Sequence, residues 1–151
     1  MHRALVRAAL ALAVAGAATA CGNESTTQPI TTTRFYLLKS IDGKPLPYNL
    51  EADPAAPKVF VVYDGLTLRA DGTASRTRTI REVTASMDET TTQTGSYTYQ
   101  LSGTRITLLP NCPPGAMCVP GEEGTISGSQ LTLNFDSPTA KVWTYARMMP
   151  D

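Results

Sequence analysis

The chain has 151 residues, with 13 basic side chains, 13 acidic side chains and a single histidine. This length suits one domain. The balanced charge argues against a nucleic-acid-binding protein, which needs a clustered basic surface.

Residues 1–20 have the pattern of a signal peptide. A short basic start precedes a small, Ala-rich apolar run, and Ala18-Thr19-Ala20 forms a small-residue cleavage pattern. The run is too short and too rich in Ala to span a bilayer, which needs about 20 strongly apolar residues. The alternative, an N-terminal helix of the folded domain, lacks any polar face. Cleavage would remove His2 and leave 11 basic against 13 acidic residues, a formal charge of −2.

Cys21 directly follows this pattern. The sequence Ala18-Thr19-Ala20-Cys21 resembles the lipobox of bacterial lipoproteins. The resemblance implies that Cys21 carries a diacylglycerol and anchors the protein to a membrane. The alternative is ordinary secretory cleavage, which would leave a secreted chain with an odd number of cysteines. Because an unmodified odd thiol is a liability in an oxidising compartment, lipidation is favoured.

Residues 21–32 are expected to form the lipid anchor and a flexible tether. Gly22 to Thr32 is polar and has no apolar periodicity. As a random coil it would span roughly 18 Å. Gly22 after the Cys resembles the default for outer-membrane sorting. We therefore expect an exported protein of the cell envelope, lipid-anchored at the outer membrane or a periplasmic face if the organism has two membranes.

Residues 33–151 are expected to form a single β domain. Short alternating or β-branched runs are separated by turn signals, and no window shows a helical apolar stripe; Arg81 to Glu89 is interpreted as strand continuation and loop. The dipeptides interpreted as turns are Asp42-Gly43, Asp64-Gly65, Asp71-Gly72, Ser102-Gly103 and Ser127-Gly128. The pattern predicts an all-β, antiparallel meander of about eight strands, as a barrel or a barrel-like sandwich.

Several of these strand-and-turn units also suggest a family. They are Phe35-x-Leu37, Ser40-Ile41-x-Gly43, Leu66-Thr67-Leu68-x-x-Asp71-Gly72-Thr73, Gly95-x-Tyr97, Gly103-x-x-Ile106-Thr107-Leu108, Gly124-Thr125-Ile126-x-Gly128-x-x-Leu131-Thr132-Leu133 and Tyr145-x-Arg147. Over about residues 34–147 the chain resembles bacterial lipocalin-like lipoproteins, small barrels of calycin type. The resemblance implies an eight-stranded barrel that binds a small apolar ligand, with Arg147 lying across an aromatic ring at the barrel end.

Cys112 and Cys118 are the remaining cysteines. In an exported protein, two cysteines six positions apart favour a disulfide that closes the Pro- and Gly-containing loop between them. A redox site is disfavoured because the spacing is not Cys-x-x-Cys and no basic residue lies in the loop. A metal site would need more soft ligands, and the mature chain has no histidine. We therefore expect neither a metal nor a cofactor.

Four aromatic residues alternate on two predicted strands: Tyr97 and Tyr99, then Trp143 and Tyr145. Residues two apart point to the same side of a strand. Facing the barrel interior, they could line a pocket for an apolar ligand. The alternative is that they simply fill a small barrel, whose interior side chains can nearly close.

Two pairs of charged residues are interpreted as having no role in binding or catalysis. Arg76 and Arg78 share one face of a strand, which we expect to be solvated and to protect a sheet edge. Glu122 and Glu123 are expected on a turn, where they cannot form a catalytic carboxylate pair across a cleft. Without a histidine, nucleophilic catalysis lacks its usual base.

The sequence therefore predicts a non-enzymatic, lipid-anchored envelope protein that binds a small apolar ligand. One alternative is a protein-interaction or scaffold lipoprotein with a filled barrel, in which loops such as residues 111–120 meet a partner. A third, disfavoured alternative is an enzyme.

Overall fold

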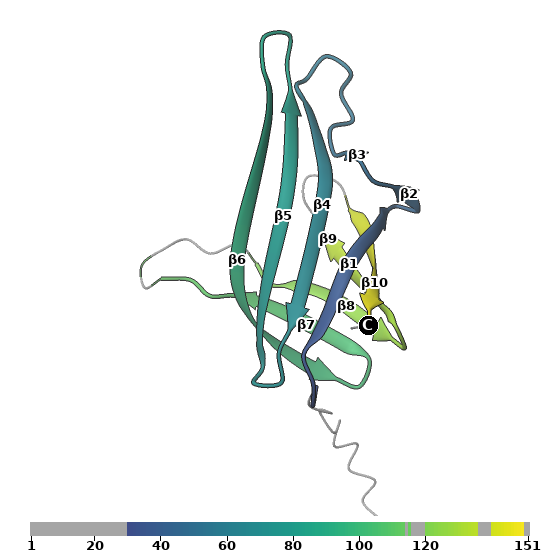
Figure 1. The fold of residues 1–151 in the computed structure, drawn as a ribbon, viewed down its shortest axis with the longest axis vertical. Helices are drawn as coiled ribbons and strands as arrows, with labels where there is room; N and C mark the ends of the chain where they lie inside the picture. The colour runs from purple at the N-terminus through teal and green to yellow at the C-terminus, as the bar shows by residue number, and fades with distance from the viewer. Residues whose placement is uncertain (1–29, 114, 116–119, 136–139, 150–151) are drawn as a thin grey trace, which may run out of the picture.

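The computed structural model describes residues 30–113, 115, 120–135 and 140–149, and within them every regular element is a β-strand (Figure 1). The strands are β1 (Arg34–Ile41), β2 (Lys44–Pro45), β3 (Tyr48–Asn49), β4 (Lys58–Leu68), β5 (Thr73–Val83), β6 (Asp88–Ser102), β7 (Arg105–Pro110), β8 (Glu122–Ser127), β9 (Gln130–Phe135) and β10 (Lys141–Met148). The described part of the chain holds no helix long and apolar enough to cross a membrane. The predicted all-β class is confirmed.

Eight of these strands close into a barrel. From β4 to β10, each long strand pairs antiparallel with the next one in the sequence. The barrel closes through β1, which pairs with β10 on one side and with β4 on the other. The short strands β2 and β3 are additions beside β1 and β4. The predicted antiparallel meander of about eight strands is therefore confirmed, as a closed barrel.

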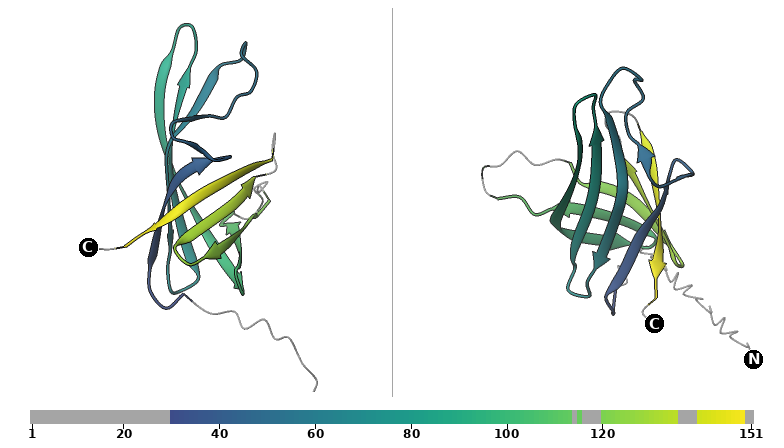
Figure 2. Two further views of the ribbon diagram at one scale, coloured as in Figure 1. Left: turned by 90° about the vertical axis from the view of Figure 1, so that its right-hand side faces the viewer. Right: turned by 45° about the horizontal axis from the view of Figure 1, so that its top comes forward.

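The strands of the barrel differ in length, and this difference shapes the molecule. Strands β4, β5 and β6 have 11, 11 and 15 residues and continue as a three-stranded extension beyond the shorter strands β7 to β10 (Figures 1 and 2). Strand β6 pairs with β5 from Asp88 to Thr98, but with β7 only from Tyr97 onward. The part of β6 before Tyr97 therefore has a partner strand on one side only.

We call the two ends of the barrel the tether end and the extension end. Strand β1 starts at the tether end, where the chain enters, and an antiparallel meander brings the end of β10 to the same place (Figure 1). The turns after β4, β6 and β8 also lie at the tether end. At these turns Gly72, Gly103 and Gly128 have φ values of 83°, 61° and 58°. Glycine adopts such positive φ values at little cost, and these three predicted turns are confirmed.

The predicted turn at Asp64-Gly65 is wrong. Both residues lie inside β4, where Gly65 pairs with Leu37 on one side and Thr77 on the other. A Cβ atom at Gly65 would lie 2.5 Å from the hydroxyl oxygen of Tyr63 and 3.0 Å from the Phe35 ring. Glycine at position 65 thus makes room for two aromatic rings in a continuous strand, and it does not reverse the chain.

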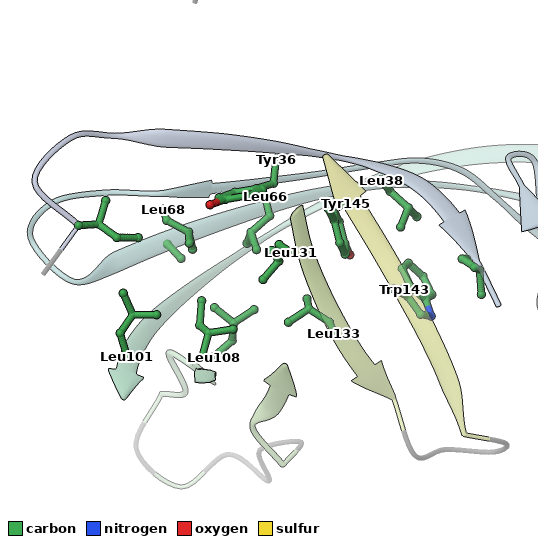
Figure 3. Packing of buried hydrophobic residues seen from close by; sticks show 14 of the residues in the cluster. Tyr36, Leu38, Leu66, Leu68, Leu101, Leu108, Leu131, Leu133, Trp143 and Tyr145 are labelled. Carbon is green, nitrogen blue, oxygen red and sulfur yellow. The ribbon is translucent and has the colours of Figure 1, made fainter. Parts of the chain in front are cut away.

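The core fills the barrel with aliphatic and aromatic side chains that alternate along each strand (Figure 3). Each of these side chains is fully buried, and together they come from five of the barrel strands: Tyr36, Leu66, Leu68, Ile106, Leu108, Leu131, Leu133 and Tyr145. The period of two that predicted the strands thus also assigns their inward faces.

Candidate functional site

A cluster of charged and polar side chains crosses the barrel interior on the side of the extension end. Asp64 comes from β4, Arg76 and Arg78 from β5, Glu122 from β8 and Tyr145 from β10. We call these five residues the arginine cluster. Two of its charged members are buried, with 0% of Asp64 and 3% of Arg76 exposed.

The strand registers explain how the cluster forms. Ala74, Arg76 and Arg78 are each two residues apart along β5, so their side chains point to the same, inward side. An irregularity in the β4–β5 register between Val61 and Tyr63 precedes the pairing of Asp64 with Arg78. Asp64 thereby lies on the inward side, beside both arginines.

Arg76 is bonded through all three of its guanidinium nitrogens. Its Nε donates to both carboxylate oxygens of Asp64, at 2.9 Å each. Its Nη1 donates to Glu122 Oε2 at 2.6 Å, and its Nη2 donates to the Tyr145 hydroxyl oxygen at 2.6 Å. The Tyr145 hydroxyl in turn donates to Asp64 Oδ1 at 3.2 Å, and Arg78 Nε donates to Asp64 Oδ2 at 2.7 Å. Buried charges of this kind are stable only when they are paired in this way.

Two aromatic rings cover the guanidinium groups. The central carbon of Arg76 lies 4.9 Å from the Phe135 ring centre and 5.2 Å from that of Trp143. The central carbon of Arg78 lies 4.5 Å from the Trp143 ring centre. The two rings also contact each other, with centres 4.8 Å apart. These cation–π contacts attract the arginines to the ring faces.

The cluster changes the protonation of its members. Burial raises the pKa of Tyr145 well above its ordinary value, so the phenol stays protonated. Burial also raises the pKa of Glu122, although the charges of Arg76 and Arg78 oppose that rise. Burial alone would lower the pKa of Arg76, but Tyr145, Asp64 and Glu122 outweigh it and raise that pKa. Arg76 is therefore a permanent cation inside the barrel.

Two of the sequence interpretations are wrong here. Arg76 and Arg78 do not form a solvated face at a sheet edge, because β5 is paired on both sides and its arginine face points inward. Glu122 and Glu123 do not lie on a turn, because they begin β8. Asp64 belongs to the cluster and was missed because Asp-Gly was interpreted as a hairpin turn. The inward side shared by Arg76, Arg78 and buried Ala74 was the signal that could have revealed the cluster.

The four aromatic residues predicted as pocket walls separate into two groups. Tyr145 is a buried member of the arginine cluster, and Trp143 is buried against it. Tyr97 is half-buried against the core near Gly95, the residue that pairs with Arg76. Tyr99 points to the tether end, where its hydroxyl donates to the backbone carbonyl of Arg69.

Two hollows of the described part of the molecule lie at its surface. Tyr99 lines one of about 380 Å³, between the β4–β5 turn and the start of β7. Another of about 410 Å³ lies among the segments after β1 and includes Tyr48 and Lys141. The barrel axis itself is occupied by the fully buried side chains of the core (Figure 3).

Two buried donors beside the cluster have no hydrogen-bond partner. They are Trp143 Nε1 and Arg78 Nη2, and the two side chains stack on each other. A buried donor without a partner costs about 1–3 kcal/mol, so each has the capacity to bind an acceptor. The cluster can therefore hold charge and bind hydrogen-bond acceptors.

The other predicted sites are placed only in part. Cys21 and Cys118 lie outside the described residues, so the lipid anchor and the Cys112–Cys118 disulfide remain predictions. Arg147, half-buried at the tether end, pairs with Tyr36 across β1 and β10.

Among the described residues, no group of three or more His, Cys, Asp or Glu side chains could hold a metal ion. Comparison with protein-family models, curated proteins and solved structures finds no match to the chain.

Proposed function

We propose that this protein is a non-enzymatic, lipid-anchored protein of the cell envelope whose filled barrel is a rigid body for binding another protein. The observation that carries the proposal is the occupied interior. Core leucines fill the half near the tether end, and the paired charges of Asp64, Arg76 and Glu122 cross the other half. An apolar molecule entering the barrel would have to separate these charges.

The free edge of β6 is the proposed contact surface. Ser96 accepts a hydrogen bond from the Asn111 backbone N–H, so the Ser96 carbonyl points away from β5. Because backbone groups alternate along an antiparallel strand, those of Thr90, Thr92 and Thr94 also point outward. Exposed edges of this kind accept an extended peptide as an additional strand.

The side chains of this edge support the same role. Protected edges usually carry lysine, proline or a bulge. Between Asp88 and Ser96 there is no lysine or proline, and the pairing with β5 has no bulge. The edge consists mostly of threonine, and its residues from Asp88 to Thr94 are all exposed.

Charge indicates the chemistry of the partner. Glu82 and Glu89 lie directly opposite each other on one face, where like charges repel. On the other face Asp88 is already paired with Arg81. An extended segment with a lysine or arginine beside Glu89 would relieve the repulsion. We therefore propose such a basic, extended segment of an envelope protein as the partner.

Photocrosslinking in the host tests this proposal. A photoreactive residue replaces Thr94, alone and together with Thr92→Pro. Proline at 92 removes an outward N–H and keeps the backbone hydrogen bonds to β5, losing only the exposed side-chain bond to Thr79, so the fold should be retained. We expect a crosslinked protein with the Thr94 probe that disappears with Thr92→Pro. The same probe at exposed Thr125 on β8 is the matched control, and we expect no such product there. Absence of the product at Thr94, or its persistence in a folded Thr92→Pro variant, would contradict the proposal.

Binding of a small apolar molecule is the second candidate function. Its support is the contact between Phe135 and Trp143, together with the unpartnered donors Trp143 Nε1 and Arg78 Nη2. Binding sites for small molecules are commonly apolar with a few polar groups. A ligand bound here would lie against the arginine cluster at the extension end and present an acceptor to these donors.

A further inference from the structure

Arginines gather at the tether end of the barrel. Arg34 begins β1, Arg69 follows β4, Arg105 begins β7 and Arg147 lies one residue before the end of β10. These positions come from distant parts of the sequence, and the meander brings them to one end of the barrel (Figure 1). The concentration of positive charge there is therefore a product of the topology.

This positive charge is not neutralised within the described residues. None of these four arginines makes an ion pair in the described part of the chain. Asp71 is the one acidic residue described at this end, and its carboxylate accepts from the Thr73 N–H and hydroxyl. Four arginines and one aspartate leave a formal charge of +3.

The extension end has the opposite character. Its acidic residues outnumber its basic ones, which are Lys39, Lys44, Lys58, Arg76, Arg78, Arg81 and Lys141. The acidic residues at this end are Asp42, Glu51, Asp53, Asp64, Glu82, Asp88, Glu89, Glu122 and Glu123. The molecule is thus polarised along the barrel axis, and an anionic surface would attract the tether end and repel the extension end.

Exposed methionines lie beside the arginines. Met148 is 41% exposed and Met149 is 81% exposed, directly after Arg147. Flexible apolar side chains next to basic residues are typical of surfaces that bind the interface of a bilayer, where the apolar groups reach past the headgroups.

The chain also enters the barrel at this end. Ile30 is buried here, just before β1. Ile30 follows Cys21 by nine positions, and nine residues span at most about 32 Å. A lipid on Cys21 would therefore keep the arginines close to the membrane that holds it.

We propose that the tether end docks on an anionic lipid surface, with Arg34, Arg69, Arg105 and Arg147 against the headgroups and Met149 inserted among them. The orientation in the cell rests on the proposed lipid anchor, whereas the affinity for lipid belongs to the barrel. Docking in this way directs the β4–β6 extension and the free edge of β6 away from the membrane.

Vesicle binding by a chain without the anchor tests the proposal. The mature chain from residue 21, with Cys21→Ser, is mixed with phosphatidylcholine vesicles that contain or lack phosphatidylglycerol, and bound protein is measured by flotation. We expect binding only to vesicles with phosphatidylglycerol, and weaker binding as salt rises. Each basic residue near an anionic bilayer strengthens binding about fivefold. Arg69→Glu with Arg105→Glu, both on exposed side chains, should therefore weaken binding at least about tenfold.

The matched control places the same charge change at the other end. Lys44→Glu with Lys58→Glu should leave binding within about twofold of the parent chain, because those side chains face away from the bilayer. Equal losses in the two double variants would show attraction by net charge alone and would overturn the proposal, as would absence of binding by the parent chain. The mass of the full chain extracted from its host reports acylation separately, so failure of the anchor and failure of the surface are distinguishable.

Discussion

The two halves of the barrel interior are built from the same alternating strands but are held together in different ways. Near the tether end, Leu68, Leu101 and Leu131 make a core of ordinary apolar contacts. Toward the extension end, Arg76 and Asp64 occupy equivalent inward positions and make a core of hydrogen bonds and ion pairs. In the apolar half, removing a side chain leaves a cavity that the fold can tolerate. In the charged half, removing one charge leaves its partner buried and unpaired.

Removing the shared carboxylate should have the largest effect. Asp64→Ala leaves Arg76 and Arg78 without the group that accepts from both of them. Loss of one partner in a buried ion pair typically costs about 3–5 kcal/mol, and we expect this loss in the free energy of unfolding measured in urea. Asp71→Ala at the exposed β4–β5 turn is the control and should cost much less. Equal losses would show that the buried charges do not stabilise this half.

Truncation in the apolar half should have a similar or slightly smaller effect. Leu68→Ala removes a fully buried side chain and leaves a cavity, for which we expect a loss of about 2–4 kcal/mol by the same measurement. Leu109→Ala is the control, because Leu109 is 38% exposed, and it should cost less than about 1 kcal/mol. A Leu68→Ala loss as small as the Leu109→Ala loss would indicate a loosely packed interior.

Two buried tyrosines sharpen the comparison, because only one of them belongs to the arginine cluster. Tyr145→Phe removes the hydroxyl bonded to Arg76 and Asp64, and we expect it to cost about 1–3 kcal/mol in thermal or urea unfolding. The Tyr36 hydroxyl is buried without a hydrogen-bond partner. Tyr36→Phe should therefore be neutral or slightly stabilising. A larger loss for Tyr36→Phe than for Tyr145→Phe would reverse the roles assigned to them.

The smallest expected effect is a change in pH dependence. Burial holds the pKa of Glu122 above its ordinary value of 4.5, so the folded protein keeps this proton at pH values where the unfolded chain loses it. The contribution of Glu122 to stability is therefore complete below about pH 4.5 and is lost as pH rises through the elevated pKa. With Glu122→Gln, the free energy of unfolding should fall less steeply as pH rises from about 4.5 through the raised pKa of Glu122. Glu123→Gln is the matched control, because it makes the same chemical change at an exposed side chain of the same strand.

The fold was largely predictable from the sequence, for a physical reason. Alternation of apolar and polar residues reports burial of one strand face, and Gly72, Gly103 and Gly128 mark chain reversals that need positive φ. These signals are local. The prediction of a turn at Asp64-Gly65 failed because Asp-Gly is not specific to turns. Here the Asp forms a buried ion pair and the Gly allows a close aromatic contact, and only the tertiary structure distinguishes this role from a turn.

The arginine cluster was not predictable by the same reasoning. In a strand where polar and apolar residues alternate, a charged residue is interpreted as facing solvent unless its partner is known. The partners of Arg76 lie 12, 46 and 69 positions away, at Asp64, Glu122 and Tyr145. Closure of the barrel brings them together, and no local pattern encodes that distance. Trp143 and Tyr145 were identified by their spacing, but their arginine neighbours were not.

Native mass spectrometry can show whether the barrel is filled by its own side chains. The protein is extracted from its own host in detergent and weighed before and after mild denaturation. We predict one folded species with the mass of the acylated chain less two hydrogens for the Cys112–Cys118 disulfide, and no small molecule released on unfolding. A small molecule that remains bound in the folded state and is released on unfolding would contradict the filled barrel and establish a ligand-binding protein.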